Sequence, residues 1–180
     1  THLHLCSYTV DRVEEAAGDD FGEMKSRFQP DGITWLQIHG LEDTDAVQTV
    51  CTHFGIDFLV MQDILNTDHA SKVEEHDQYN VIIAKQIMGG EAMQVSLVQG
   101  ADFVLTFQER DNDFFDDVMR AIRNNVLKIR TRQSDYLFSV LLNGLITGYM
   151  SVAAAISDGL EELESALLAD TGDRDIGVQM

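Results

Sequence analysis

The chain has 180 residues, and 44% of them are hydrophobic, which is enough to build a packed core without disulfide or metal staples. It carries 12 basic and 31 acidic side chains, for a formal net charge of −19 with the histidines neutral. Such a charge repels nucleic-acid phosphates and attracts cations, which argues against a direct nucleic-acid partner and for a solvated acidic surface.

The N-terminal part is predicted to hold two strands separated by a weakly specified segment. Residues 1–10 alternate loosely and predict an edge strand, and residues 33–39 form a β-rich run that stops at Gly40. Between them, residues 11–32 are acidic, carry glycines and the only proline, and predict at most one short helix.

Two amphipathic helices are expected next. The first is capped by Asp43 or Thr44 and carries its apolar residues at helical spacing. The second covers about residues 58–66. Because its apolar residues define the buried side, Gln62 and Asp63 fall on the opposite, exposed side.

The rest of the chain predicts strands followed by helices. Three strands with glycine turns between them cover residues 79–88, 93–99 and 102–108. A helix over residues 112–126 follows. Residues 134–168 repeat apolar positions at helical spacing and predict either one long helix or two helices broken near Gly159.

This order of elements predicts an α/β fold, with a mixed β-sheet sandwiched between helices in an α/β/α arrangement. We expect a sheet domain over residues 1–132. Over residues 133–180 we expect C-terminal helices that pack on the sheet and begin a long helical region.

The C-terminal helical stretch also raises the question of a membrane span. No charged residue lies between Asp135 and Asp158, a length that can cross a bilayer. Polar residues nevertheless recur at every fourth position and draw one stripe along the helix, at Ser139, Asn143, Thr147 and Ser151. A lipid-facing span gains nothing from such a stripe, whereas a helix packed on a sheet does, so we expect a soluble helix.

The two cysteines, Cys6 and Cys51, stand in no spacing typical of a metal site or a disulfide framework. Isolated thiols fit a reducing compartment, most simply the cytoplasm. Residues 1–10 do not resemble a secretory signal, and a start on threonine suggests that the natural protein is longer.

The short motifs of nucleotide-binding, hydrolase and zinc-protease sites do not occur, so we expect no enzyme. His2 and His4 share one strand face and could bind a metal, but a solvated terminus is the simpler interpretation. Four aspartates from Asp111 to Asp117 crowd a predicted helix start, where the helix dipole already explains them without a metal.

The exposed pair Gln62 and Asp63, together with Asn143 in the polar stripe, is the remaining candidate site. One carboxylate with two amides can form a weak or outer-sphere site for Mg²⁺, an ion that keeps most of its waters. An exposed aspartate on a helix is more often simply solvated, so the spacing of these residues alone does not establish a metal site.

Six short segments follow one another along the chain: HGLEDT, HFGI, DILN, KVEE, QVSL and VLTFQE. Taken together in this order, they resemble the cytoplasmic domain of the CorA family of divalent-cation transporters. The resemblance runs over nearly the whole chain and is weakest near the N-terminus. It implies an α/β/α domain at the wide cytoplasmic end of a funnel-shaped homopentamer, whose stalk helix and membrane helices follow later in the family's longer chains.

The resemblance also implies regulatory divalent cations bound between subunits. Asp63 matches a ligand position of the family and would pair with an acidic residue of a neighbouring stalk. Gln62 and Asn143 stand where the family often has glutamate and aspartate, so each replaces a charge by an amide and would attract Mg²⁺ more weakly. The implied protein is a magnesium sensor whose bound ions hold the ring closed.

For the longer protein the resemblance implies an inner-membrane transporter of Mg²⁺ or Co²⁺, with this domain on the cytoplasmic side. The chain itself would be soluble, unable to conduct ions, and monomeric or weakly oligomeric. Two alternatives stay open: the same domain of a zinc-transporting relative, and a free-standing acidic binding module.

Overall fold

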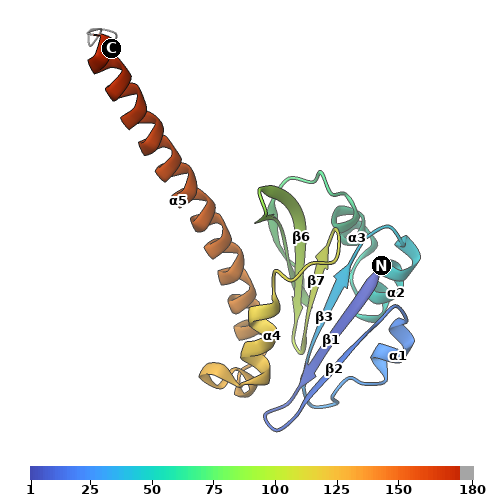
Figure 1. Cartoon of the computed structure of the whole chain (residues 1–180). Coiled ribbons are helices and arrows are strands. Elements are labelled where there is room, and N and C mark those ends of the chain that lie inside the picture. The colour runs from blue at the N-terminus through green and yellow to red at the C-terminus, as the bar shows by residue number, and fades with distance from the viewer. Residues whose placement is uncertain (175–180) are drawn as a thin grey trace.

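A seven-stranded mixed sheet forms the centre of the computed structural model, which describes residues 1–174 without the side chains of residues 151–152 and 170–174. The strand order is β2-β1-β3-β7-β6-β5-β4, of which Figure 1 labels the part from β2 to β6. The strands are β1 (His2–Tyr8), β2 (Val13–Gly18), β3 (Ile33–His39), β4 (Lys72–Glu75), β5 (Tyr79–Met88), β6 (Glu91–Gly100) and β7 (Phe103–Gln108). β3 and β7 pair in parallel, and the other neighbouring strands pair antiparallel.

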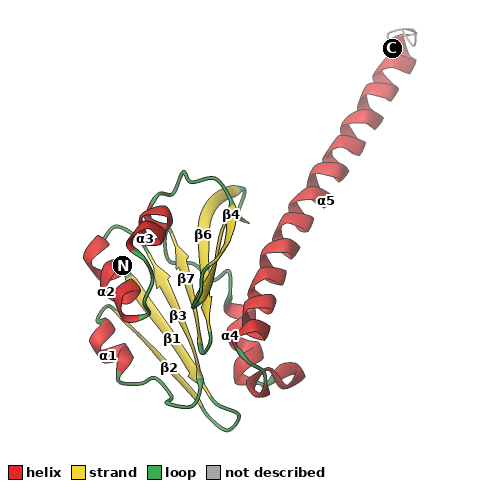
Figure 2. Cartoon of the chain, turned by 180° about the vertical axis from the view of Figure 1, so that it is seen from behind, coloured by secondary structure: helices red, strands yellow, loops and turns green. Residues whose placement is uncertain are grey.

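Helices cover both faces of this sheet (Figure 2). One face carries α1 (Phe21–Lys25), α2 (Thr44–His53) and α3 (Phe58–Leu65). The other carries α4 (Asp116–Arg123), the 3-10 helix η1 (Val126–Thr131) and the first turns of α5 (Ser134–Arg174). The predicted α/β/α arrangement is confirmed.

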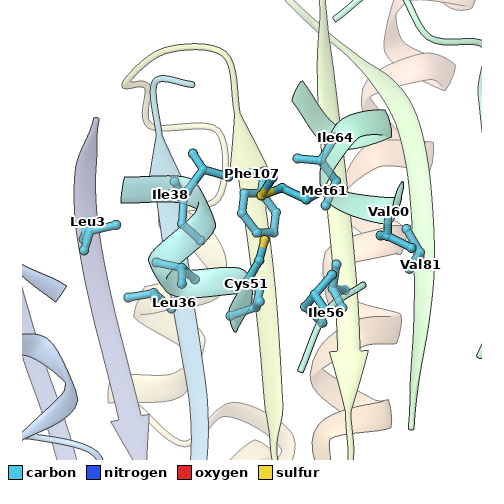
Figure 3. Close-up of a cluster of buried hydrophobic side chains, with 14 of the residues drawn as sticks. Leu3, Leu36, Ile38, Cys51, Ile56, Val60, Met61, Ile64, Val81 and Phe107 are labelled. Carbon is cyan, nitrogen blue, oxygen red and sulfur yellow. The ribbon is translucent and has the colours of Figure 1, made fainter. Parts of the chain in front are cut away.

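Alternation along the central strand β3 supplies a core to each face. Leu36 and Ile38 point to the face of α2 and α3, where they share one core with Cys51, Met61 and Phe107 (Figure 3). Trp35 points the other way and packs beneath α4 and α5. A central strand that is buried on both sides therefore fixes the positions of both helical layers.

Two strands were not predicted from the sequence. Residues 11–32 contain β2 as well as the short helix α1, so β1 is an inner strand and its assignment as an edge strand was wrong. At the opposite edge, β4 consists of only four residues, Lys72–Glu75. Both strands are short and charged, which is typical of the edges of a sheet. They therefore lack the alternating apolar pattern from which a strand is predicted.

The helices after β7 also differ from the prediction. α4 is shorter than the expected 112–126 at both ends, since it begins at Asp116 and ends at Arg123. At its C-terminal end Asn125 adopts a left-handed backbone conformation with φ of 50°, which separates it from η1. α5 is one continuous helix of 41 residues, so the alternative with a break near Gly159 was wrong.

α5 packs on the sheet with its first turns and then extends away from it (Figure 1). Leu137, Leu141 and Leu145 are buried against the sheet, whereas residues 153–169 are exposed throughout. Residues 133–180 were expected to pack on the sheet, but the described part of this segment does so only near its start. The domain boundary at residue 132 stays a prediction. The tail after residue 174 lies outside the described residues.

By length and composition alone, α5 could cross a membrane, a test that core helices of soluble proteins also pass. The polar stripe is exposed at Ser139, Asn143 and Thr147, as expected, and the side chain of Ser151 lies outside the described residues.

Candidate metal centre

α3 presents the predicted ligands because only one of its sides packs on the sheet. Val60, Met61 and Ile64 are buried against the sheet. Helical spacing then leaves Gln62 exposed and places Asp63 at the partly exposed margin of the helix. The structure therefore confirms that Asp63 is accessible, with 32% of its side chain exposed.

Asp63 is paired with nitrogen atoms at both carboxylate oxygens. Oδ2 accepts a hydrogen bond from the Lys72 ammonium on β4, which also donates to Glu74. Oδ1 lies 3.3 Å from Nε2 of His69. Hydrogen bonds to Asp63 and Glu74 raise the pKa of Lys72, so this cation persists at any physiological pH. A divalent ion that approaches Asp63 therefore competes with an ammonium group.

More carboxylates surround this pair. Nε2 of His76 lies 2.8 Å from Oε2 of Glu74, and Nδ1 of the same ring lies 3.9 Å from Oδ2 of Asp57. Hydrogen bonds from Lys72 and His76 lower the pKa of Glu74, which stays ionised. Each of Asp57, Asp63 and Glu74 offers hard oxygen atoms of the kind that Mg²⁺ prefers, but each is paired with a lysine or histidine nitrogen, and the described residues do not gather the three around one ion. Sequence reasoning missed Lys72 and Glu74 because β4 was not predicted.

Asn143 is not part of this cluster. It lies on α5, across the sheet from α3, and lines a hollow of about 420 Å³ between α4 and α5 with Phe114, Asp117 and Thr147. Gln62 and Asp63 are consecutive residues of α3, exposed and partly exposed respectively, whereas Asn143 of the same chain lies on the other side of the sheet. A shared ion would require Asn143 of a second copy.

Comparison with known proteins identifies relatives along most of the chain. Residues 30–179 match the family described as "CorA-like Mg2+ transporter protein". Over 172 residues the chain is 33% identical to the cobalt/magnesium transport protein CorA of Thermotoga maritima. This alignment covers 92% of the chain and 49% of that protein, so the chain spans about half the length of this curated relative.

Solved structures share the fold. The CorA magnesium transporter of Methanocaldococcus jannaschii matches with a TM-score of 0.66 at 19% identity, over 93% of this chain and 51% of that chain. The soluble domain of CorA from the same organism matches with a TM-score of 0.66 at 20% identity, over 93% of this chain and 64% of that chain. The ZntB cytoplasmic domain of Vibrio parahaemolyticus matches with a TM-score of 0.64 at 10% identity, over 88% of this chain and 63% of that chain.

Proposed function

Since the chain belongs to the CorA-like Mg²⁺ transporter family, we propose that it is the cytoplasmic regulatory domain of a divalent-cation transporter and senses Mg²⁺ through Asp63. The family consists of transporters rather than enzymes. The observation that carries the proposal is the accessible Asp63 carboxylate, at the position to which the family resemblance assigns a ligand, in a chain of net charge −19. We infer that the longer protein lies in the inner membrane and moves Mg²⁺ or Co²⁺.

The proposed mechanism is electrostatic. Neighbouring copies in a ring would turn acidic surfaces toward each other, and like charges at short range repel. A hydrated Mg²⁺ between Asp63 and an acidic side chain of the next copy offsets that repulsion and holds the ring closed. When the ion leaves, the copies separate and the gate loosens. Lys72 keeps the site weak, because it neutralises Asp63 whenever no ion is bound.

Isothermal titration of the chain with MgCl₂ is expected to show weak binding that Asp63→Ala lowers further, because the variant removes the charged ligand. Asp68→Ala, at an exposed aspartate beyond the end of α3, is the matched control and should leave the isotherm unchanged. Tight binding that survives Asp63→Ala would overturn the assignment of the site.

Lys72→Gln is expected to strengthen Mg²⁺ binding by about threefold to tenfold at low salt, because it removes the cation that competes for Asp63. The gain should shrink as the salt concentration rises and screens the pair. Lys25→Gln, at an exposed lysine of α1, removes the same charge elsewhere and controls for net charge. An equal gain in both variants would show that only the overall charge matters.

We also propose that α5 mediates assembly. Beyond the sheet it exposes apolar side chains at Ile156, Leu160 and Leu163, spaced so that they share one side of the helix. Sedimentation velocity of the chain should show weak, concentration-dependent association. Leu160→Glu with Leu163→Glu should abolish it while leaving the thermal unfolding of the sheet domain unchanged, since neither residue belongs to a core. Association that persists in this double variant would exclude α5 as the contact.

A zinc-transporting protein is the second candidate, because the ZntB cytoplasmic domain shares the fold. Uptake assays on the longer protein, with Mg²⁺ and Zn²⁺ in parallel, would separate the two. If the longer protein transports Zn²⁺ in preference to Mg²⁺, the proposed sensor role of this domain would stand, but its metal would be zinc.

A further inference from the structure

Side chains from distant parts of the sequence meet at one end of β1, β3 and β7. His2 and His4 lie on one face of β1, and Asp111 follows β7. β1 pairs with β3, and β3 with β7, so the sheet brings these segments together. One potential ligand atom of each of the three residues lies within 4.8 Å of the other two.

We propose that His2, His4 and Asp111 bind a transition-metal divalent cation of the Zn²⁺, Co²⁺ and Ni²⁺ class. Two imidazoles and one carboxylate are a ligand set that proteins use for zinc and related metals, with an open position for water. Mg²⁺ prefers oxygen ligands, so this cluster would discriminate against it. The site is separate from Asp63, and neither depends on the other.

The His2 ring is held in the orientation that a metal ligand needs. Its Nδ1 lies 2.6 Å from Oδ1 of Asp19, and since a carboxylate only accepts, Nδ1 carries the proton. Nε2 then keeps its lone pair for an ion. A carboxylate behind a ligating histidine is a recurrent feature of metal sites, because it fixes the tautomer and raises the basicity of the ring.

His4 supplies the second observation. Its Nε2 is shielded from solvent and has no hydrogen-bond partner in the described part of the chain, while Oδ1 of Asp111 lies 3.6 Å away. A shielded ring nitrogen without a partner is unfavourable in a folded protein. A bound cation between this nitrogen and the Asp111 carboxylate would satisfy both groups.

Asp111 has its own support from β3. Oδ1 of Asp111 lies 2.9 Å from Nδ1 of His39, whose side chain is only 2% exposed. The same Nδ1 accepts a hydrogen bond from the backbone N–H of Asn112 at 3.3 Å, so His39 holds the loop that carries Asp111 beside the cluster. The His4 ring is a neighbour of two other imidazoles: its centroid lies 4.7 Å from that of His2 and 4.8 Å from that of His39.

Only a small movement of side chains is needed to bring the three ligand atoms to the distances of a bound metal ion. Tetrahedral zinc with bonds of about 2.0–2.1 Å places its ligand atoms about 3.3 Å apart. The present spread of 4.8 Å contracts to that value by side-chain rotation. The Asp111 side chain is 62% exposed, so it is the ligand that would turn from His39 toward the two other histidines.

Titration of the chain with ZnCl₂ alone should show a single site, and CoCl₂ alone should give the intense visible absorption of four-coordinate cobalt. His4→Ala and Asp111→Ala should each weaken Zn²⁺ binding by at least about tenfold, a loss expected for a ligand. His53→Gln, at an exposed histidine of α2, and acetylation of the Thr1 amine should change nothing.

Cross-titration separates this site from the proposed magnesium sensor. Asp63→Ala should leave Zn²⁺ binding intact, and His4→Ala should leave the Mg²⁺ isotherm intact. Zn²⁺ binding that is unchanged in both His4→Ala and Asp111→Ala would overturn the site without touching the role of Asp63. Should His4→Ala fail to fold by circular dichroism, Asp111→Ala, on an exposed loop, decides the question.

Discussion

Trp35→Ala is expected to lower the free energy of unfolding by about 3–5 kcal/mol, the range for deleting a buried aromatic side chain. Trp35 is fully buried on the central strand β3, and its ring meets that of Phe115 edge-on at a centroid distance of 6.2 Å. Its indole Nε1 donates to Oγ1 of Thr106 at 3.2 Å. Alanine leaves a cavity beneath α4 and α5 and an unpaired buried hydroxyl. Urea unfolding followed by circular dichroism measures the loss.

Two further variants calibrate that result. Trp35→Phe keeps most of the volume and removes the N–H donor, so it should cost less than alanine does. Leu59→Ala, at a side chain of α3 that is 75% exposed, should stay within about 0.5 kcal/mol of the parent chain. A Trp35→Ala loss no larger than that of Leu59→Ala would contradict the packing described for this face of the sheet.

Both cysteine thiols are expected to resist alkylation by iodoacetamide at pH 8 in the folded chain. Burial raises the pKa of Cys6 and of Cys51 from 9.0 to about 12. The thiolate is the nucleophile, so its fraction, and with it the rate, should fall roughly a thousandfold relative to the chain in urea. Raising the pH toward 12 should restore reactivity, because the protonated form predominates only below the folded pKa. Mass spectrometry of quenched samples measures both rates.

The same experiment tests the arrangement of the two cores. Cys6 lies in the core beneath α4 and α5, and Cys51 in the core beneath α2 and α3, so the sheet separates them. No disulfide between the two should form under mild oxidation. Rapid labelling of either thiol at pH 8 would show that its side of the sheet opens readily.

The strongly periodic parts of the fold were predictable from the sequence, whereas its margins were not. β3 and β5–β7 carry long apolar or alternating runs, and α2 and α3 repeat apolar residues at helical spacing. β2 and β4 are short, and charged residues interrupt them, because edge strands bury only part of one face. Their pairing depends on contacts with strands far away in sequence, which local patterns do not encode.

The same limit applies to the candidate sites. Helical spacing correctly predicted that Asp63 is accessible, because that property depends on α3 alone. The pairing of Asp63 with Lys72 could not be predicted, since it requires β4 to lie beside β5. His2 and His4 were recognised as sharing one strand face, but Asp111 meets them only through the order β1-β3-β7. Strand order, rather than local sequence, decides which polar residues meet.

The exposed length of α5 has a mechanical consequence. Between Met150 and Arg174 a straight helix rises by about 36 Å, at about 1.5 Å per residue. A tilt of about 5° at its base would then shift its tip by about 3 Å, a geometric amplification that follows from the helical rise. Leu137, Leu141 and Leu145 fix the start of α5 to the sheet. A small rotation of the sheet would therefore produce a displacement of several ångströms at the far end of the helix.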